Sequence, residues 1–194
     1  QCITIPKPMK RCILLKEISI SNTLETLKSR LDENSLLHVQ ARFGIYPKKG
    51  FVFNNPIEIE ELERIIIDNE LILSNNHKEF LLLHNGAEFF TYEYGYSFRL
   101  YSIEEVIREY NEMLNYNFSN YIKQNCYPIG SVIDIGPILV DHSKVNQTGK
   151  ENILLLDNIE TIDFCCDLNN WLDRMVCAEG NLYWEWYSKV VQHE

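Results

Sequence analysis

The feature that most constrains the fold is an alternation of aromatic residues in the middle of the chain. Every second position there carries a large apolar side chain: Phe90, Tyr92, Tyr94, Tyr96, Phe98 and Leu100. Successive side chains of a strand point to opposite faces, so this spacing predicts β-structure with one almost wholly aromatic face. Gly95 interrupts the other phase and predicts a bulge or a hairpin turn within the run.

Segments with helical periodicity lie on both sides of this region. Asn22 to Leu31 carries leucines at helical spacing, with Ser21 or Asn22 as its N-cap. Asn55-Pro56 predicts a second helix, since Asn is a good cap and Pro suits the first helical position. The other expected helices run from Ser74 to His84, from the capping box Ser102-Ile103-Glu104-Glu105, and along Trp171, Leu172, Met175 and Val176 to an end at Gly180.

Shorter apolar runs predict the remaining strands. They are Leu36–Ile45 and Phe51–Phe53 around a turn at Pro47–Gly50, two strands within Tyr127–Val140, then Ile153–Leu156 and Thr161–Cys165 around Asp157-Asn158. Helices at both ends and strands in the middle favour an α+β fold over a βαβ repeat. We expect a central, mostly antiparallel sheet with helices packed on it.

The length of 194 residues allows one domain with a real core. We expect residues 51–194 to form the main domain and residues 1–50 to extend it as a helix and a strand. Apolar phase in each element predicts one shared core, made of Ile59, Leu62, Phe80, Leu83, Val106, Ile129, Leu155, Trp171 and Leu172.

The segment His84-Asn85-Gly86 has two interpretations, a reactive site or the end of a helix. His84 has no Ser, Cys or acidic partner at a motif spacing. Gly86 stands where a left-handed residue commonly ends a helix, and Asn85 often precedes such a residue. Capping therefore accounts for Asn85 and Gly86 as a structural motif with Gly86 at positive φ.

The charge is distributed unevenly along the chain. Residues 1–50 carry nine Lys/Arg against four Asp/Glu, and residues 51–194 carry nine against twenty-four. A body with a charge of −15 repels nucleic acid and attracts basic partners, although acidity also serves solubility. No apolar run approaches the length of a membrane helix, and cysteines without Cys-x-x-Cys spacing favour a reduced, cytoplasmic protein.

Motifs of catalysis and cofactor binding are missing from the sequence. It contains no nucleotide-binding glycine motif, no H-E-x-x-H and no G-x-S-x-G. The five histidines are scattered, and none is spaced from a cysteine like a zinc ligand. Asp141-His142-Ser143 has the residue types of a triad, but neighbours in sequence cannot supply its geometry. We expect no enzyme, no metal and no cofactor.

Several segments together resemble the SUKH superfamily, which includes fungal cell-wall regulators and many bacterial immunity proteins. They are Pro56 to Glu63, "HKEFLLLHNGAEFF", "YSFRLYSIEEVI", "CYPIGS" and "NNWLDRMVCAEGNLYWEWY". The resemblance covers about Asn55 to Tyr187, and the order of the segments is more specific than any one of them. One departure is Leu73-Ser74, where the family usually has Leu-Pro, and serine is also an excellent helix cap.

The resemblance implies an α+β fold without catalysis and a role as a cytoplasmic antitoxin. Such a protein binds and blocks a cognate toxin domain, often a basic nuclease, without contacting nucleic acid or membrane itself. An acidic inhibitor gains fast, electrostatically steered capture of a basic cleft. Two alternatives are a regulatory scaffold for other proteins and a module that binds a small ligand beside the aromatic strand.

The candidate toxin-binding residues are carboxylates close to aromatic residues in the middle of the chain. They are Glu88, Tyr92, Glu93, Tyr94, Tyr96, Asp157 and Glu160. Each has a competing structural role, because a strand needs one buried face for its tyrosines and an exposed carboxylate is commonly only a solvated charge. Glu88 and Glu93 fall off the aromatic phase, so we expect both to be exposed.

Overall fold

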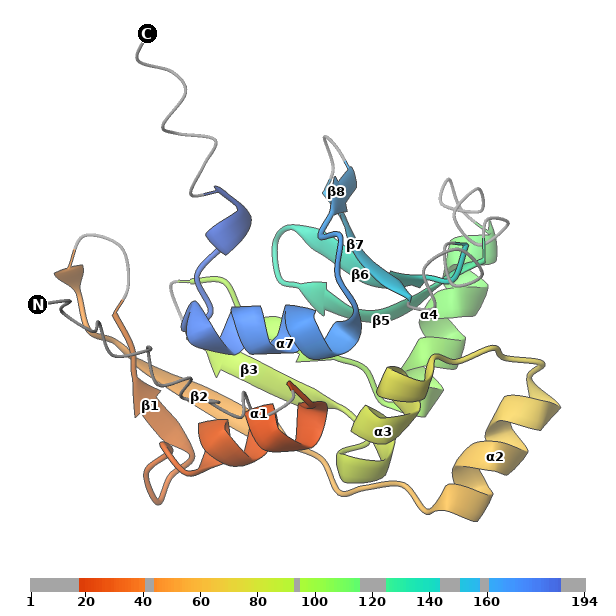
Figure 1. Ribbon diagram of the computed structural model, residues 1–194, viewed down its shortest axis with the longest axis horizontal. Coiled ribbons are helices and arrows are strands. Elements are labelled where there is room, and N and C mark those ends of the chain that lie inside the picture. Colours follow the sequence, from red (N-terminus) through yellow and green to blue (C-terminus); the bar gives the residue numbers. More distant parts are fainter. Residues whose placement is uncertain are drawn as a thin grey trace, which may run out of the picture.

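The sheet of the computed structural model is an antiparallel meander. The structure describes residues 18–40, 44–92, 95–115, 125–143, 151–157 and 161–185. Within them, eight strands lie in chain order and each is paired with its neighbours in sequence (Figure 1). The strands are β1 (Leu36–His38), β2 (Lys48–Phe53), β3 (Ala87–Thr91), β4 (Phe98–Leu100), β5 (Cys126–Val132), β6 (Gly136–Asp141), β7 (Asn152–Leu156) and β8 (Thr161–Asp163).

Helices interrupt the meander and cover parts of it, which confirms the predicted α+β fold. The helices are α1 (Ile20–Lys28), α2 (Ile59–Asp68), α3 (Asn75–Leu83), α4 (Ile103–Asn115) and α7 (Leu168–Cys177), followed by the 3-10 turn η2 (Tyr183–Glu185). Figure 1 shows α1, α3 and α7 side by side on one face of the sheet, and α1 contacts both of the others. None of the helices in the described segments is long and apolar enough to cross a membrane.

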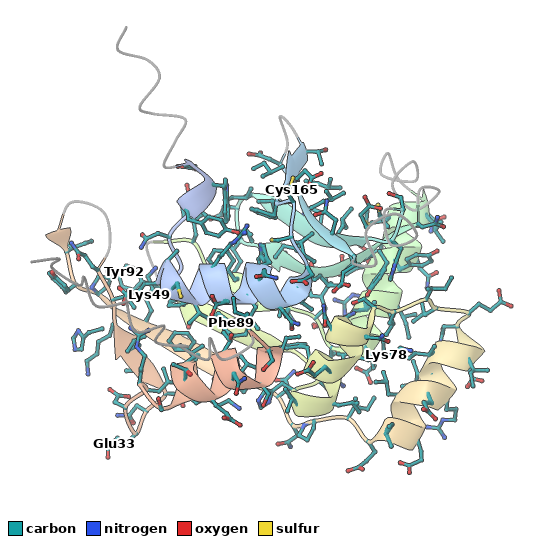
Figure 2. All side chains as sticks on the ribbon, in the orientation of Figure 1. Glu33, Lys49, Lys78, Phe89, Tyr92 and Cys165 are labelled. Atoms are coloured by element: carbon teal, nitrogen blue, oxygen red, sulfur yellow. The ribbon has the colours of Figure 1, made fainter. Side chains whose placement is uncertain are left out.

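The main core fills the space between these three helices and the sheet. Phe89 lies in this layer, beneath the helices in Figure 2, and Trp171 of α7 packs edge-on against Phe98 of β4. Residues from before and after position 100 share the core, as predicted, including Leu62, Phe80, Val106, Ile129, Leu155, Trp171 and Leu172. Leu83 is only partly buried at its edge.

The prediction for Ile59 is wrong, because half of its side chain is exposed (50%). Helix α2 begins at Ile59 after Glu58, whereas the sequence predicted a start at Asn55 and Pro56. Ile57 occupies the buried position before the helix, and Leu62 anchors its first turn. The start lies later because the backbone of Asn55 pairs elsewhere: its carbonyl accepts from the Asn85 N–H at 3.0 Å.

The boundaries of α1 and of the β1–β2 pair also differ from prediction. Helix α1 begins earlier, after Ser19, whose side chain accepts from the Asn22 N–H at 3.2 Å. Strand β1 ends at His38, and β2 begins at Lys48 within the predicted Pro47–Gly50 turn. Lys49 explains the second difference: its side chain is buried and its ammonium lies 5.6 Å from the centre of the Phe90 ring.

The aromatic run forms a hairpin, which confirms the turn that Gly95 predicted. Strands β3 and β4 pair on either side of it, so the alternation does not continue through one strand. Phe89 and Phe90 are both buried because Phe90 has a positive φ of 58°, which changes the phase at the end of β3. Tyr96 is 39% exposed in the connection, and Glu93 and Tyr94 lie outside the described residues.

The opposite face of the sheet carries a smaller core under α4. In β6 and β7, Leu139 and Leu154 join Met113 of α4, whereas their sequence neighbours Val140 and Ile153 belong to the main core. Because successive strand residues point to opposite faces, Met113 near the end of α4 packs on the face away from α1, α3 and α7, whereas Ile103 and Val106 in the first turn of α4 join the main core. On the face away from those three helices, α4 covers residues of β5 to β7 and leaves the region of β2 to β4 open.

A buried polar cluster joins α3 to the sheet. His77 is 1% exposed, its Nδ1 lies 3.2 Å from the Tyr127 hydroxyl, and the two rings stack at 5.6 Å. Tyr127 also stacks on His142 and accepts from the Ser74 N–H at 3.0 Å. Burial, followed by the neighbouring charge of His142, lowers the pKa of His77 to about 3, so the imidazole is neutral in the folded protein.

The neutral state of His77 makes stability depend on pH. Below about pH 6.5 the unfolded chain takes up a proton that the folded protein excludes. The contribution of His77 to stability should therefore be fully present above this pH and decrease towards pH 3, by at most ~1.4 kcal/mol per pH unit for one proton. Chemical denaturation between pH 7.5 and pH 5 measures this slope.

His77→Phe should flatten the slope, and His38→Phe at the exposed end of β1 is the matched control. His142, whose pKa burial also lowers, leaves some slope in the His77 variant. Equal slopes in the wild type and the His77 variant would contradict a neutral, buried His77.

Candidate partner-binding groove

Five directly opposed residues form one row across strands β2 to β6. They are Val52, Glu88, Arg99, Ser131 and Pro137, each the register partner of the next. Directly opposed residues of antiparallel strands place their side chains on the same face. Their sequence neighbours, such as Phe89 and Leu100, point into the main core, so the row lies on the open face. Val52 at its end is 51% exposed.

Helix α4 borders this row with three carboxylates. Glu105, Glu109 and Glu112 are spaced four and three residues apart, which places them on one side of a helix. Two hollows lie between helix and row. The Arg99 hollow, of about 140 Å³, is lined by Val52, Asn54, Glu88, Arg99, Ser102 and Glu105. The Met113 hollow, of about 350 Å³, is lined by Tyr101, Glu109, Glu112, Met113, Pro128 and Pro137, with Ser131 beside them.

Arg99 of the first hollow is the register partner of Ser131 of the second, so the two hollows are neighbours across β4 and β5, and together they are called the groove. Four carboxylates and one guanidinium line the groove, a formal charge of −3. Arg99 forms an ion pair with Glu105, and Arg108 at the rim lies 3.0 Å from Glu109. In the described part of the chain, Glu88 and Glu112 form no ion pair. The groove therefore presents net negative charge to a partner.

Tyr101 supplies a neutral polar group at the floor of the Met113 hollow. Its side chain is 8% exposed, and burial raises the pKa of its hydroxyl, which is hydrogen-bonded to Ser131. The hydroxyl therefore stays protonated at neutral pH. An uncharged floor beneath charged walls can bind a long side chain, but it contains no activated nucleophile.

The Asn85-Gly86 junction sets the position of the groove. The Ile103 N–H at the start of α4 donates to the Asn85 side-chain oxygen at 2.8 Å. The Asn54 side chain donates to the Asn85 carbonyl at 2.7 Å, and the Asn54 N–H donates to the Gly86 carbonyl at 3.0 Å. These bonds join the end of β2 to the start of α4, which are the two walls of the Arg99 hollow.

Gly86 has a φ of 97°, which confirms the predicted positive value. The predicted cap differs in detail, because α3 ends at His84 in extended backbone and Asn85 caps the following helix α4. His84 links elements too: its Nδ1 lies 2.7 Å from the Asn54 carbonyl and its Nε2 lies 2.5 Å from Lys28 Nζ. These contacts give His84 a structural role.

The described residues include no group of three or more His, Cys, Asp or Glu side chains that could hold a metal ion. In Asp141-His142-Ser143, the Asp141 carboxylate accepts from the Ser143 N–H at 2.7 Å, and His142 stacks on Tyr127. These contacts support a structural role for that segment.

Of the predicted site residues, Glu88 lies in the groove, where it is half-buried instead of exposed. Tyr92, Tyr96 and Asp157 lie outside it, at the end of the sheet where the β3–β4 and β7–β8 connections emerge. Glu160 falls outside the described residues, as do Glu93 and Tyr94. The β3–β4 connection adjoins the β5–β6 turn through the Ile133 N–H, which donates to Ser97 at 3.0 Å, and Ile133 is exposed.

Sequence reasoning missed the carboxylates of α4. The sequence predicted a capping box for Glu104 and Glu105 and no functional role for Glu109 or Glu112. Their spacing from Glu105 predicts one charged side of the helix, which is the available signal. Nothing in that spacing indicates that this side borders the open half of a sheet.

The geometry defines an α+β domain whose sheet is covered by helices on one face and carries an acidic groove on the other. The profile of the SMI1/KNR4 family (SUKH-1) matches residues 55–174, and the chain belongs to this family. The chain is similar to two uncharacterized proteins of Bacillus subtilis strain 168. It is 26% identical to YobM over 175 residues, 86% of this chain and 91% of YobM. It is 32% identical to YnaB over 139 residues, 70% of this chain and 87% of YnaB.

Gly86→Ala should destabilise the fold by at least about 1 kcal/mol, measured by denaturant unfolding. A β-carbon there would lie 2.8 Å from the Asn54 side chain and 3.0 Å from the Ser102 nitrogen, in backbone that favours glycine. Gly95→Ala is the control, because its β-carbon would meet only Tyr92 at 3.5 Å. Equal stabilities of the two variants would show that the junction is not constrained.

Glu105→Ala should also destabilise the protein by about 1 kcal/mol, because Glu105 completes a capping box. Its carboxylate accepts from the Ser102 N–H at 3.1 Å, and its own N–H donates to the Ser102 hydroxyl at 3.3 Å. Glu112→Ala, on the same side of α4 but exposed, should change the free energy of unfolding by less than about 0.5 kcal/mol. A Glu105 variant as stable as the Glu112 variant would refute this role.

Proposed function

We propose that this protein is a non-enzymatic immunity protein that binds and blocks a basic toxin domain in the cytoplasm. Membership of the SMI1/KNR4 family supports an immunity-like or regulatory role. The acidic groove on the open face of the sheet is the observation that carries the proposal. Occupying a basic active cleft prevents substrate entry and requires no chemistry from the inhibitor.

The dimensions of the groove suit a protein partner. Its row crosses five strands, which at about 4.8 Å between neighbours spans about 19 Å. A standard interface buries about 800 Å² on each partner, so the row would form the centre of such a contact. A central position favours a large contribution to affinity, because water is excluded there.

The charge pattern suits capture of a nuclease. A nuclease cleft is basic because it binds phosphates, and the groove carries a formal charge of −3. Opposite potentials accelerate association more than they tighten the complex. Arg99, paired with Glu105 in the middle of the groove, offers one positive group to an acidic residue of the partner, which would fix the register of docking.

Two alternative functions would use the same groove in different ways. A regulatory scaffold would bind a cellular protein that is not a toxin, and a neighbouring gene for a toxin would argue against it. A ligand-binding module would use the Met113 hollow, whose volume of about 350 Å³ lies at the lower end of ligand pockets. A rise in melting temperature with a small molecule alone would favour that module.

Charge reversal in the groove tests the proposal. Glu88→Lys with Glu112→Lys should slow association with the basic toxin domain that the protein blocks by about tenfold at low ionic strength, with a smaller effect at high salt. Glu25→Lys with Glu33→Lys is the control, with the same charge change in α1, whose buried residues belong to the main core, and in the turn after it, where Figure 2 shows Glu33. Stopped-flow mixing measures the rates.

A third variant separates the groove from the predicted surface at the end of the sheet. Tyr96→Ala with Asp157→Lys changes that end alone, and should associate at the wild-type rate if the groove is the binding surface. If this variant associates slowly and the groove variant associates at the wild-type rate, the interface lies at the β3–β4 and β7–β8 connections instead. No binding of any basic toxin domain by the wild type would remove the immunity proposal itself.

A further inference from the structure

The Met113 hollow combines an apolar floor with charged walls. Met113 is buried, and Pro128 and Pro137 add ring carbons without any backbone N–H. Tyr101 closes the floor with a hydroxyl already bonded to Ser131. An occupant that enters this hollow therefore gains mainly from apolar contact along its length.

The wall formed by α4 adds a requirement for positive charge. Glu109 and Glu112 lie three residues apart on the helix, so their like charges repel each other. Arg108 pairs with Glu109 from the rim, whereas Glu112 has no ion pair among the described residues. The charge of Arg108 also acts on Glu112, but without a direct ion pair. A cation at the mouth of the hollow would relieve the remaining repulsion and pair directly with Glu112.

We propose that the Met113 hollow binds one lysine or arginine side chain of the partner protein. These side chains have an apolar stem and a charged end, which match the floor and the walls in that order. A purely apolar side chain would leave Glu112 unpaired near its tip, and an acidic one would be repelled by both carboxylates. The source of the side chain, a basic toxin domain, rests on the proposed function; the chemistry of the hollow does not.

The Met113 hollow and the Arg99 hollow therefore differ in how strongly they attract a cation. Arg99 is already neutralised by Glu105, so the Arg99 hollow adds little net attraction for a cation. The Met113 hollow is larger, and at its wall Glu112 has only the charge of Arg108 nearby and no direct ion pair among the described residues. The partner's basic anchor is therefore assigned to one end of the groove, which gives the complex a fixed direction.

Small amides that imitate single side chains test this assignment on the full chain. The probes are Nα-acetyl-L-lysinamide, Nα-acetyl-L-argininamide and Nα-acetyl-L-norleucinamide, the last with an apolar stem and no charge. NMR titration of ¹⁵N-labelled protein should show saturable shifts at the amides of Tyr101, Met113 and Ser131 with both cationic probes. Norleucinamide should bind these positions at least about tenfold more weakly.

Matched variants locate the charge requirement. Glu109→Gln with Glu112→Gln should weaken the cationic probes at least about tenfold, whereas Glu60→Gln with Glu63→Gln on exposed positions of α2 should leave them unchanged. Glutamine keeps the size of the side chain, and unchanged spectra away from α4 report an intact fold.

Norleucinamide binding as tightly as the cationic probes, or no saturable shift with either cation, would overturn the inference. If the cationic probes bind the hollow and no toxin domain binds the protein, the inference stands and the proposed function fails. If a toxin domain binds with the same affinity to the Gln variant of Glu109 and Glu112, the inference fails and the proposed function stands.

Discussion

The hydrogen bond from the Ile103 N–H to the Asn85 side chain determines where α4 begins, and the groove depends on it. The Asn85 carbonyl also accepts a hydrogen bond from the Asn54 side chain, so Asn85 joins the end of β2 to the first turn of α4. Gly86 allows this because its φ is positive and because a β-carbon at this position would lie 3.0 Å from the Ser102 nitrogen, where it would clash. Without the junction, Glu105 could not at once cap α4 and pair with Arg99.

The strand order of the meander extends this local geometry across the sheet. Every strand is antiparallel to its neighbours, so one row of opposed residues can run straight across five strands. Helices α1, α3 and α7 bury the other face, and α4 covers only part of this one. The part left open carries Glu88 and Arg99 on strands, which hold side chains more firmly than connections do. An acidic groove built on such a row suits recognition of a preformed partner surface.

The elements with strong local signals were predictable from sequence, and the site was not. Ser74 and the Ser102–Glu105 capping box mark helix starts by hydrogen bonds within one turn, and both form as expected. Asn55 does not cap α2, because its carbonyl accepts a hydrogen bond from the distant Asn85 N–H. No pattern in the sequence predicts such a bond. Glu88 was a candidate by its phase alone, whereas Glu109 and Glu112 acquire meaning only beside Pro137, which lies more than twenty residues later. Pairing across strands, not periodicity, brings these residues together.

Carboxyl footprinting in the presence and absence of a basic toxin domain that binds this protein tests the central claim most directly. A carbodiimide couples exposed carboxylates to an amine, and mass spectrometry then measures the labelling of each glutamate with and without the partner. The groove account predicts that the partner protects Glu88 and Glu112 and leaves Glu25 and Glu33, on and after α1, labelled as before. Unchanged labelling of Glu88 and Glu112, with protection of Glu25 or Glu33, would contradict it.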